Sequence, residues 1–423
     1  MTFPNQSGIV RVVSILKDRD FRGLFLADTA SQLGTQVLVL AIPLAAVQSL
    51  NASEFEVGLL AALQTAAFLL IGLPAGAIVD RQRKRNVMIV ADWGRALTLA
   101  SVPLAWWFDV LTMGHLYAVA VIMGLFTVFF DVAYQSYLPY LLDRDKLVRG
   151  NSALEVVRTV SQLGGPPVSG WLIQWLTAPF ALLTTVVGFA WSALCLGTIR
   201  KREQRQPRSE DRHLGREIME GLRFVLGHRL LRRIAGSTGT FNLFWSMANP
   251  MIILLLARDL ELSAGVIGLL TAVGGLGGLV GAAVASKFAA KVGQGPAIWM
   301  STALSAPFGF LLPIVEADWR LGLVVVQEFM FGLGVVLYNV TQLSFRQAIT
   351  PEPLLGRMNA TMRFLVWGTM PIGGIIGGVL GEVIGVRNTL WICAAGATLS
   401  FLWIYTSPMR TMRELPVSNH TPQ

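Results

Sequence analysis

Long apolar stretches are the feature of this sequence that most restricts its fold. A helix needs roughly 20 apolar residues to cross a bilayer, and the 423-residue chain contains twelve stretches of about this length. They cover approximately residues 21–48, 56–79, 86–107, 115–141, 153–176, 180–199, 234–257, 264–286, 296–315, 320–345, 358–381 and 388–407. None alternates strictly between apolar and polar residues, as the strands of a membrane barrel do. The sequence therefore predicts an all-α polytopic membrane protein with twelve transmembrane helices.

The charge content agrees with this class. Only 14% of the residues are charged and 53% are hydrophobic, whereas a soluble domain carries about 25% charged residues. The net charge of +9 is spread over short loops between apolar stretches, which argues against a nucleic-acid partner. Cys195 and Cys393 both fall inside apolar stretches and form neither a disulfide framework nor a metal-ligand spacing. We expect no metal and no cofactor.

Lysine and arginine are unequally divided between the two sets of loops. One set holds only Arg258, Arg320 and Arg387 out of 34 such residues. Positive residues concentrate in cytoplasmic loops, so the other set of loops is predicted to face the cytoplasm. With an even number of spans, both termini are then cytoplasmic.

The chain repeats itself with an offset of 208 residues. The matching positions are Gly124 and Leu125 with Gly332 and Leu333, Leu147, Arg149 and Asn151 with Leu355, Arg357 and Asn359, and Gly165 and Gly170 with Gly373 and Gly378. Two six-helix halves in the same orientation are typical of one class of transporter folds. We therefore divide the chain into a first half (1–199), a linker (200–233), a second half (234–408) and a cytoplasmic tail (409–423).

The linker has a polar part followed by an amphipathic part. The helical periodicity places five apolar side chains on one face, namely Ile218, Leu222, Val225, Leu226 and Leu230. This pattern favours a helix that lies at the membrane surface. A site for a regulatory partner is the alternative.

Three segments carry a resemblance to a known family. The segment "GAIVDRQRKR" (76–85) resembles the loop signature G-x-L-a-D-R-x-G-R-K of the major facilitator superfamily, with Ile78 and Arg83 as departures. "FFDVAYQSYLPYLL" (129–142) and "NATMRFLVWGTMPIGGIIGGVLGEVIGVRNTLW" (359–391) resemble the enterobactin-exporter-like branch, also called transmembrane secretion effectors, to which macrolide efflux proteins are related. The resemblance covers nearly the whole chain. It implies the major facilitator fold, a bacterial inner-membrane location and a functional monomer.

The loop signature suggests an inner gate. Its cations cannot cross the bilayer readily, so they hold the cytoplasmic end of the second span, and two glycines four residues apart offer a flat packing face. The resemblance implies that Asp80 faces the start of the eleventh span and latches the cytoplasmic side, whereas a plain turn residue is the alternative. The expected gate residues are Gly72, Gly76, Asp80, Arg81, Arg85, Asp92 and Arg95.

The fifth span carries a second signature, "QLGGPPVSGW" (162–171). Gly165, Pro166 and Gly170 match an element associated with antiporters of this superfamily, while Ser169 replaces a glycine and Pro167 is additional. The glycines allow tight helix packing and the prolines bend the helix. The resemblance implies export, and ordinary packing is a compatible alternative.

Three carboxylates in the predicted spans are candidates for proton coupling. Ionisable residues within a membrane are costly and mark functional sites by default. Asp28 and Asp131 lie at similar depths in spans that line the cavity of the implied fold. Glu328 lies near the midplane, has no cation one helical turn away, and is our first choice.

The remaining intramembrane charges have neighbours of opposite sign. Asp92 with Arg95, and Glu155 with Arg158, are three residues apart. Together with Arg363 they fall in the cytoplasmic third of their spans. Ion pairs that close the inner gate are favoured over substrate ligands, and the sequence leaves open whether Asp28 or Asp131 belongs to the same network.

Aromatic and amide side chains on the expected cavity spans suggest a substrate site. Walls of this kind suit a large, partly apolar solute, although lipid-facing or packing roles are the alternative for each residue. The candidate residues are Gln32, Gln36, Phe241, Phe244, Trp245, Asn249, Phe331, Tyr338 and Asn339.

The sequence favours transport over the other functions of membrane proteins. It contains no phosphate-binding P-loop and neither of the H-E-x-x-H and G-x-S-x-G motifs, which disfavours an ATP-driven pump and an enzyme. A proton-coupled exporter of an amphipathic small molecule, such as a siderophore or a macrolide, is the leading hypothesis. A non-transporting sensor or scaffold with the same fold is the alternative, and import remains open.

Overall fold

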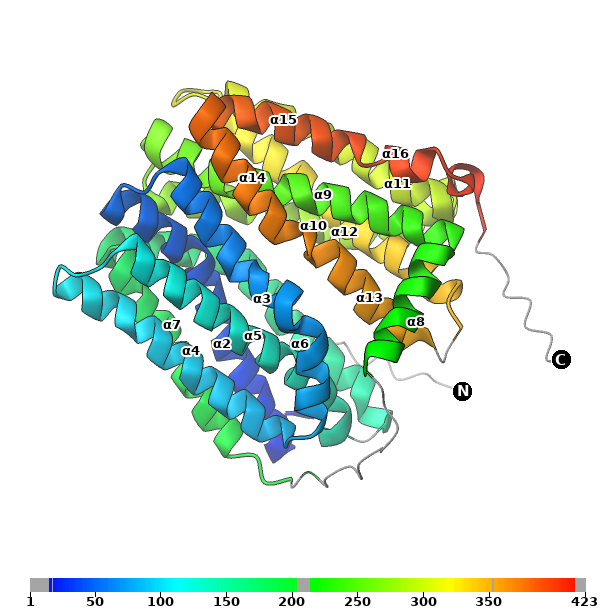
Figure 1. The fold of residues 1–423 in the computed structure, drawn as a ribbon, viewed down its shortest axis with the longest axis horizontal. Helices are drawn as coiled ribbons and strands as arrows, with labels where there is room; N and C mark the ends of the chain where they lie inside the picture. The colour runs from blue at the N-terminus through cyan, green and yellow to red at the C-terminus, as the bar shows by residue number, and fades with distance from the viewer. Residues whose placement is uncertain are drawn as a thin grey trace, which may run out of the picture.

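The computed structural model describes residues 15–16, 18–142, 144–201, 203, 214–351 and 354–414, and nearly all of these residues are helical. No strand occurs within these ranges. Figure 1 shows two groups of helices side by side, the first in blue to green and the second in green to red. The all-α fold expected from the sequence is confirmed.

The first half is built from six long helices. They are α2 (Arg19–Leu44), which continues into the π-helical turn η1 (Ala45–Ser49), α3 (Glu54–Asp80), α4 (Lys84–Trp107), α5 (Met113–Leu141), α6 (Arg144–Leu176) and α7 (Ala178–Gly197). Helix α2 packs on α6 and α7, and α5 packs on α3 and α4. A capping box between Ser53 and Glu56 fixes the start of α3.

The second half repeats this arrangement with more interrupted helices. It contains α9 (Arg229–Leu254) with the π-helical turn η2 (Leu255–Asp259), α10 (Ala264–Val292), α11 (Gln294–Ser305) with the 3-10 helix η3 (Ala306–Ile314), α12 (Leu321–Ala348), α13 (Leu355–Trp367), α14 (Thr369–Ile384), α15 (Val386–Leu399), α16 (Leu402–Tyr405) and η5 (Pro408–Thr411). Helix α9 packs on α14 and α15, and α12 packs on α10 and α11. These pairings correspond to those of the first half, as the sequence repeat predicts.

Eleven of the described helical segments are long and apolar enough to cross a membrane, with α13 and α14 together forming one of them. Helix α6 is not among the eleven, although its 33 residues exceed the length of a span. Its polar side chains and its two prolines lower its mean hydropathy. The count of twelve spans therefore stays a prediction.

The short helix α8 (Leu214–Gly227) precedes α9 and packs on α13 (Figure 1). Glu220 of α8 and Arg357 of α13 form an ion pair of 2.8 Å. Of the apolar face predicted for a helix at the membrane surface, Val225 is buried, whereas Leu226 is 49% exposed and Leu230 belongs to α9. The side chain of Ile218 lies outside the described residues.

The two ends of the bundle differ. We call the end that carries α8 and the turn between α3 and α4 the α8 end, and the opposite end, where α3 begins, the Glu54 end. The halves meet along two helix pairs, α3 with α14 and α6 with α10. Figure 1 shows α3 running beside α14 and α13.

Candidate functional site

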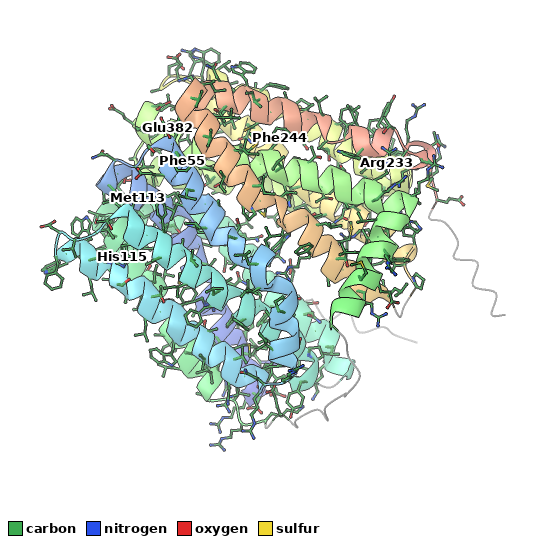
Figure 2. The ribbon with its side chains drawn as sticks, viewed as in Figure 1. Phe55, Met113, His115, Arg233, Phe244 and Glu382 are labelled. Atoms are coloured by element: carbon green, nitrogen blue, oxygen red, sulfur yellow. The ribbon has the colours of Figure 1, made fainter. Side chains whose placement is uncertain are left out.

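Glycines bring the two halves into direct backbone contact near the Glu54 end. A Cβ placed on Gly58 of α3 would lie 2.6 Å from the carbonyl oxygen of Gly374 on α14, and equally close to the Cα of Gly378. Contacts of this kind leave no room for any side chain. Figure 2 shows Phe55 of α3 and Glu382 of α14 at this end of the bundle.

The second contact between the halves uses the antiporter-like signature of α6. A Cβ on Gly170 would collide with the backbone of Ala264 on α10, and one on Gly268 would collide with the carbonyl group of Pro166. Gly165 faces the side chain of Gln36 on α2 instead. The three signature residues therefore pack α6 against its neighbours on both sides.

An ion pair also joins the halves at the Glu54 end. The carboxylate of Glu54, at the start of α3, accepts a hydrogen bond from the guanidinium of Arg258 in η2. The π-helical turns η1 and η2 contact each other nearby. The Glu54 end is thus held by backbone packing and by charge.

The predicted gate residues at the α8 end have no comparable packing. A Cβ on Gly72 or on Gly76 would have open space within 4 Å, so the expected close packing at these two glycines is absent here. Arg81 is exposed, and the side chain of Asp80 lies outside the described residues. Arg85 donates hydrogen bonds to the carbonyl oxygens of Leu196 (2.8 Å) and Gly197 (2.5 Å), which caps the end of α7.

Asp28 lies within a polar cluster of the first half. Its side chain is 3% exposed and interacts with the polar side chains of Tyr134 on α5 and of Gln32, one turn further along α2. The charges of Arg158 and Glu155 on α6 act on it from nearby. The latter two side chains form a pair with 3.7 Å between the charged atoms, and both are more than half exposed.

Asp131 and Arg363 form an ion pair between the halves. The carboxylate on α5 and the guanidinium on α13 are 3.6 Å apart, and each side chain is about one third exposed. The guanidinium also lies 4.2 Å from the ring of Trp367 and 5.4 Å from the ring of Phe68 on α3. Arg363 therefore connects α13 with two helices of the opposite half.

Asp92 and Arg95 pair inside the first half, away from this contact. Both are buried, and the Asp92 carboxylate also accepts a hydrogen bond of 2.6 Å from Ser192 of α7. The Arg95 guanidinium lies between the rings of Phe130 and Phe189, at 4.2 and 4.3 Å. The charges expected to form one gate network thus form three separate pairs.

Glu328 is isolated from all of these charges. It lies on α12, is 7% exposed, and forms no hydrogen bond or ion pair with any residue that the structure describes. Its carboxylate faces α10, where a Cβ on Gly274 would lie 3.1 Å from Oε2. The absence of a side chain at position 274 leaves space for the acid.

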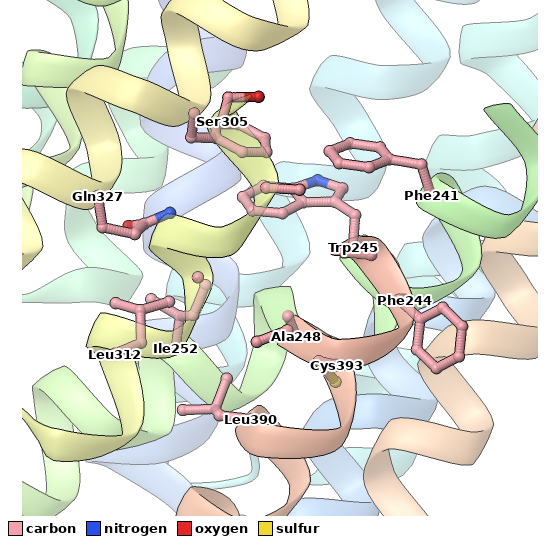
Figure 3. A pocket seen from close by; sticks show the side chains of 15 residues that line it. Phe241, Phe244, Trp245, Ala248, Ile252, Ser305, Leu312, Gln327, Leu390 and Cys393 are labelled. Carbon is pink, nitrogen blue, oxygen red and sulfur yellow. The ribbon is translucent and has the colours of Figure 1, made fainter. Parts of the chain in front are cut away.

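Three of the predicted aromatic residues stack on one another in the second half. The ring of Trp245 on α9 lies 4.0 Å from that of Phe331 on α12, with 20° between their planes. The ring of Phe241, one turn before Trp245 on α9, lies 6.2 Å from that of Phe331 with 16° between their planes. Together with Phe244 and Gln327 they line a cavity of about 50 Å³ between α9, η3, α12 and α15. Figure 3 shows Trp245 and Gln327 on opposite sides of this aromatic cavity.

The other predicted cavity residues lie elsewhere. Tyr338 is buried between α12 and α9, where its hydroxyl is 2.6 Å from that of Thr238. Asn249 and Asn339 are exposed and do not line the aromatic cavity. Within the described residues, no group of acidic, histidine and cysteine side chains could hold a metal ion.

Comparison with known proteins assigns the chain to a family. Residues 12–423 match the sequence profile described as transmembrane secretion effector. The chain belongs to this family. The resemblance to this branch of the major facilitator superfamily, seen in the sequence, is thereby confirmed.

Named relatives of this secretion-effector chain are transporters. It is 28% identical to the multidrug efflux pump Tap of Mycolicibacterium fortuitum, over 94% of this chain and 97% of that protein. It is 26% identical to the enterobactin exporter EntS of Escherichia coli O1:K1, over 97% of this chain and 96% of that protein. A crystal structure of a mutant nucleoside transporter, NupG, superposes with a TM-score of 0.77 at 11% identity, covering 91% and 99% of the two chains, and this similarity shows the fold. The family and these relatives point to a multi-pass membrane transporter rather than to an enzyme.

Sequence reasoning missed two parts of the site. Tyr134 escaped notice because the pattern of span 4 does not show which face meets Asp28. The pairing of Asp131 with Arg363 joins residues of different halves, and only the approach of α5 to α13 brings them together. Arg363 was singled out as an intramembrane cation, but its partner was not identified.

Proposed function

We propose that the protein exports an amphipathic small molecule across the bacterial inner membrane, driven by proton entry, through alternating access. The observation that carries this proposal is the contrast between the two ends of the bundle. The halves are in backbone contact near the Glu54 end, whereas the glycines at the α8 end face open space. A transporter that alternates between two states needs this asymmetry in each of them.

Helix α3 carries packing positions for both states. Gly58 and Gly76 are 18 residues apart, about five full helical turns, so they lie on the same face. Gly58 contacts α14 and Gly76 faces open space, although α13 also lies beside α3. We propose that rocking of the halves closes the α8 end by packing this glycine against α13 and opens the Glu54 end.

The polar cluster of the first half and the aromatic cavity of the second half suit an amphipathic substrate. The first half contains Asp28, Gln32 and Tyr134, whereas the second half contains the stacked rings of Trp245 and Phe331. Apolar rings with a few polar groups are typical of sites for drug-sized molecules. The names of Tap and EntS, a multidrug pump and a siderophore exporter, agree with such substrates and with the direction of transport.

Filling the space at Gly76 tests the alternating mechanism. Gly76→Leu should fold normally, because the position is open, but should hinder closure of the α8 end. Overpacking costs typically 1–3 kcal/mol, which corresponds to a loss of roughly 5- to 150-fold in the population of the closed state. Export of macrolides and of a siderophore should fall accordingly in cells lacking other pumps, as measured by accumulation at equal protein levels.

Gly322→Leu is the matched control, because that glycine also faces open space but lies at the Glu54 end, on the first turn of α12. It should export normally. Normal export by Gly76→Leu would contradict the proposed closure. Loss of export in both variants would mean that a large side chain on an exposed glycine impairs the protein at either end.

The Glu54 end is proposed to face outward and both termini inward. The few arginines of the Glu54 end each have a partner nearby. Arg258 pairs with Glu54, Arg320 pairs with Asp318, and Arg387 donates a hydrogen bond to the carbonyl oxygen of Pro313. In keeping with this, hydrogen bonds from Arg320 lower the pKa of the exposed Asp318 carboxyl. Most of the lysines and arginines of the chain belong to the loops of the other end, where they would hold those loops in the cytoplasm.

Labelling of single cysteines tests this orientation. Trp319→Cys, at an 81% exposed position of the Glu54 end, should react with a membrane-impermeant maleimide in intact cells. Arg229→Cys, at the α8 end, should react only after permeabilisation. The native cysteines Cys195 and Cys393 are buried, and the wild-type protein therefore gives the background level of labelling. The opposite pattern would invert the proposed orientation.

A further inference from the structure

A lateral groove lies near the α8 end of the second half, apart from the contact between the halves. Figure 1 shows α9 running between α13 and α14 on one side and α15 and α16 on the other. The groove follows this part of α9 and has a volume of about 570 Å³. Its lining comprises Leu226, Arg232, Arg233, Ala235, Gly236, Gly239, Thr240, Leu365, Thr369 and Trp403. We call it the Trp403 groove.

Glycines on α9 create the groove. A Cβ on Gly236 would lie 2.7 Å from the indole of Trp403, so only glycine allows the ring to lie against the helix. The indole Nε1 donates a hydrogen bond of 3.0 Å to Thr240, which fixes the ring as one wall. Trp403 remains 44% exposed and Leu226 49% exposed, so the groove opens to the surface of the bundle.

Two arginines flank the groove without an acidic partner. Arg232 is exposed, and Arg233 is partly buried, where it donates a hydrogen bond of 3.3 Å to Thr406 and lies 5.9 Å from the Trp403 ring. Neither forms an ion pair with any residue in the described part of the chain, and the lining contains no carboxylate. Figure 2 places Arg233 on α9, close to α16.

We propose that the Trp403 groove binds an anionic phospholipid of the membrane in which the protein sits. Arg232 and Arg233 would bind the headgroup phosphate. The hydroxyl of Thr240, which accepts a hydrogen bond from Trp403, would donate to a glycerol oxygen. Leu226, Leu365 and Trp403 offer apolar walls to the first methylenes. Uncompensated arginines at the end of membrane helices attract anionic headgroups. A tryptophan in the same groove is typical of the bilayer interface.

Native mass spectrometry of the purified full chain tests this site. The protein is mixed in detergent with phosphatidylglycerol or with zwitterionic phosphatidylcholine, and the bound fraction is measured over a range of lipid concentrations. The wild type should bind phosphatidylglycerol in preference. The double variant Arg232→Gln with Arg233→Gln should weaken this binding about 25-fold, because each arginine near an anionic lipid contributes about fivefold to the affinity. The measurement does not depend on the transported substrate or on the orientation proposed above.

The control is Arg223→Gln with Arg229→Gln, because these exposed arginines carry the same charge near the same end of the bundle but do not line the groove. The control should keep nearly full binding, as should the lysine pair Arg232→Lys with Arg233→Lys. If the glutamine pair and the control lost binding equally, the lipid would be held by diffuse electrostatic attraction rather than by a defined site. Displacement of the lipid by an equal concentration of inorganic phosphate, or equal binding of the two lipids by the wild type, would also overturn the proposal.

Discussion

Glu328→Gln is expected to abolish proton-driven export while leaving substrate binding and exchange intact. Burial favours the neutral form of a carboxylic acid, and glutamine is close in shape to that form. A carrier that is held in the neutral form cannot release its proton on the opposite side of the membrane. The variant should exchange labelled for unlabelled substrate across proteoliposomes at the wild-type rate, but should not accumulate substrate against its gradient.

The choice of Glu328 depends on its isolation. Asp131 already pairs with Arg363, and Asp28 interacts with the polar side chains of Tyr134 and Gln32. Glu328 has neither kind of partner within the part of the chain that the structure describes. Its charged form is therefore the least compensated of the three carboxylates, and proton binding removes that cost.

Proton release on substrate addition measures the coupling directly. Adding a transported compound to lightly buffered wild-type protein in detergent should release protons, and Glu328→Gln should release none. Asp28→Asn and Asp131→Asn are the matched controls and should keep the release. Normal accumulation and release by Glu328→Gln would exclude it as the carrier, and loss of release in one control would transfer the role to that residue.

The fold follows from features that a sequence displays directly. Apolar length is a local property, so the helices were predicted well, and the offset of 208 residues gave the two halves. Helix α6 contains the predicted span 153–176, but it is less apolar than the other long helices. Its polar residues, Glu155 and Arg158 among them, and its two prolines lower its hydropathy, whereas its contacts with α2 and α10 show that it is part of the bundle.

The site was less accessible to sequence reasoning, because it depends on which residues of different helices meet. The local pairs at three-residue spacing, Asp92 with Arg95 and Glu155 with Arg158, are present in the structure. The interaction of Arg363 with Asp131 spans the two halves and has no local signal. Under the proposed alternating access, the open space at Gly72 and Gly76 belongs to only one of two arrangements of the halves. The sequence has to be compatible with both arrangements, so it does not show which of them the structure adopts.

Arg95→Ala is expected to destabilise the first half by about 3–5 kcal/mol, the usual cost of removing one partner of a buried ion pair. The substitution leaves the Asp92 carboxylate buried with Ser192 as its remaining hydrogen-bond donor, and it empties the space between Phe130 and Phe189. Arg158→Ala is the control. It breaks a pair whose side chains are more than half exposed, and such pairs contribute about 0–1 kcal/mol.

The two buried cysteines report on the halves separately, because Cys195 lies on α7 and Cys393 on α15. Thermal unfolding in detergent is followed with a thiol-reactive dye, in a Cys393→Ala background to observe Cys195 and in a Cys195→Ala background to observe Cys393. Replacing Arg95 should decrease the melting temperature reported by Cys195 more than that reported by Cys393. Asp92→Asn with Arg95→Leu should recover much of the loss, since replacing both members of a buried pair is often close to neutral. If Arg95→Ala melts like Arg158→Ala, the buried pair does not stabilise the first half. If the double variant is less stable than Arg95→Ala, the aromatic contacts of the guanidinium, rather than the charge left on Asp92, account for the loss.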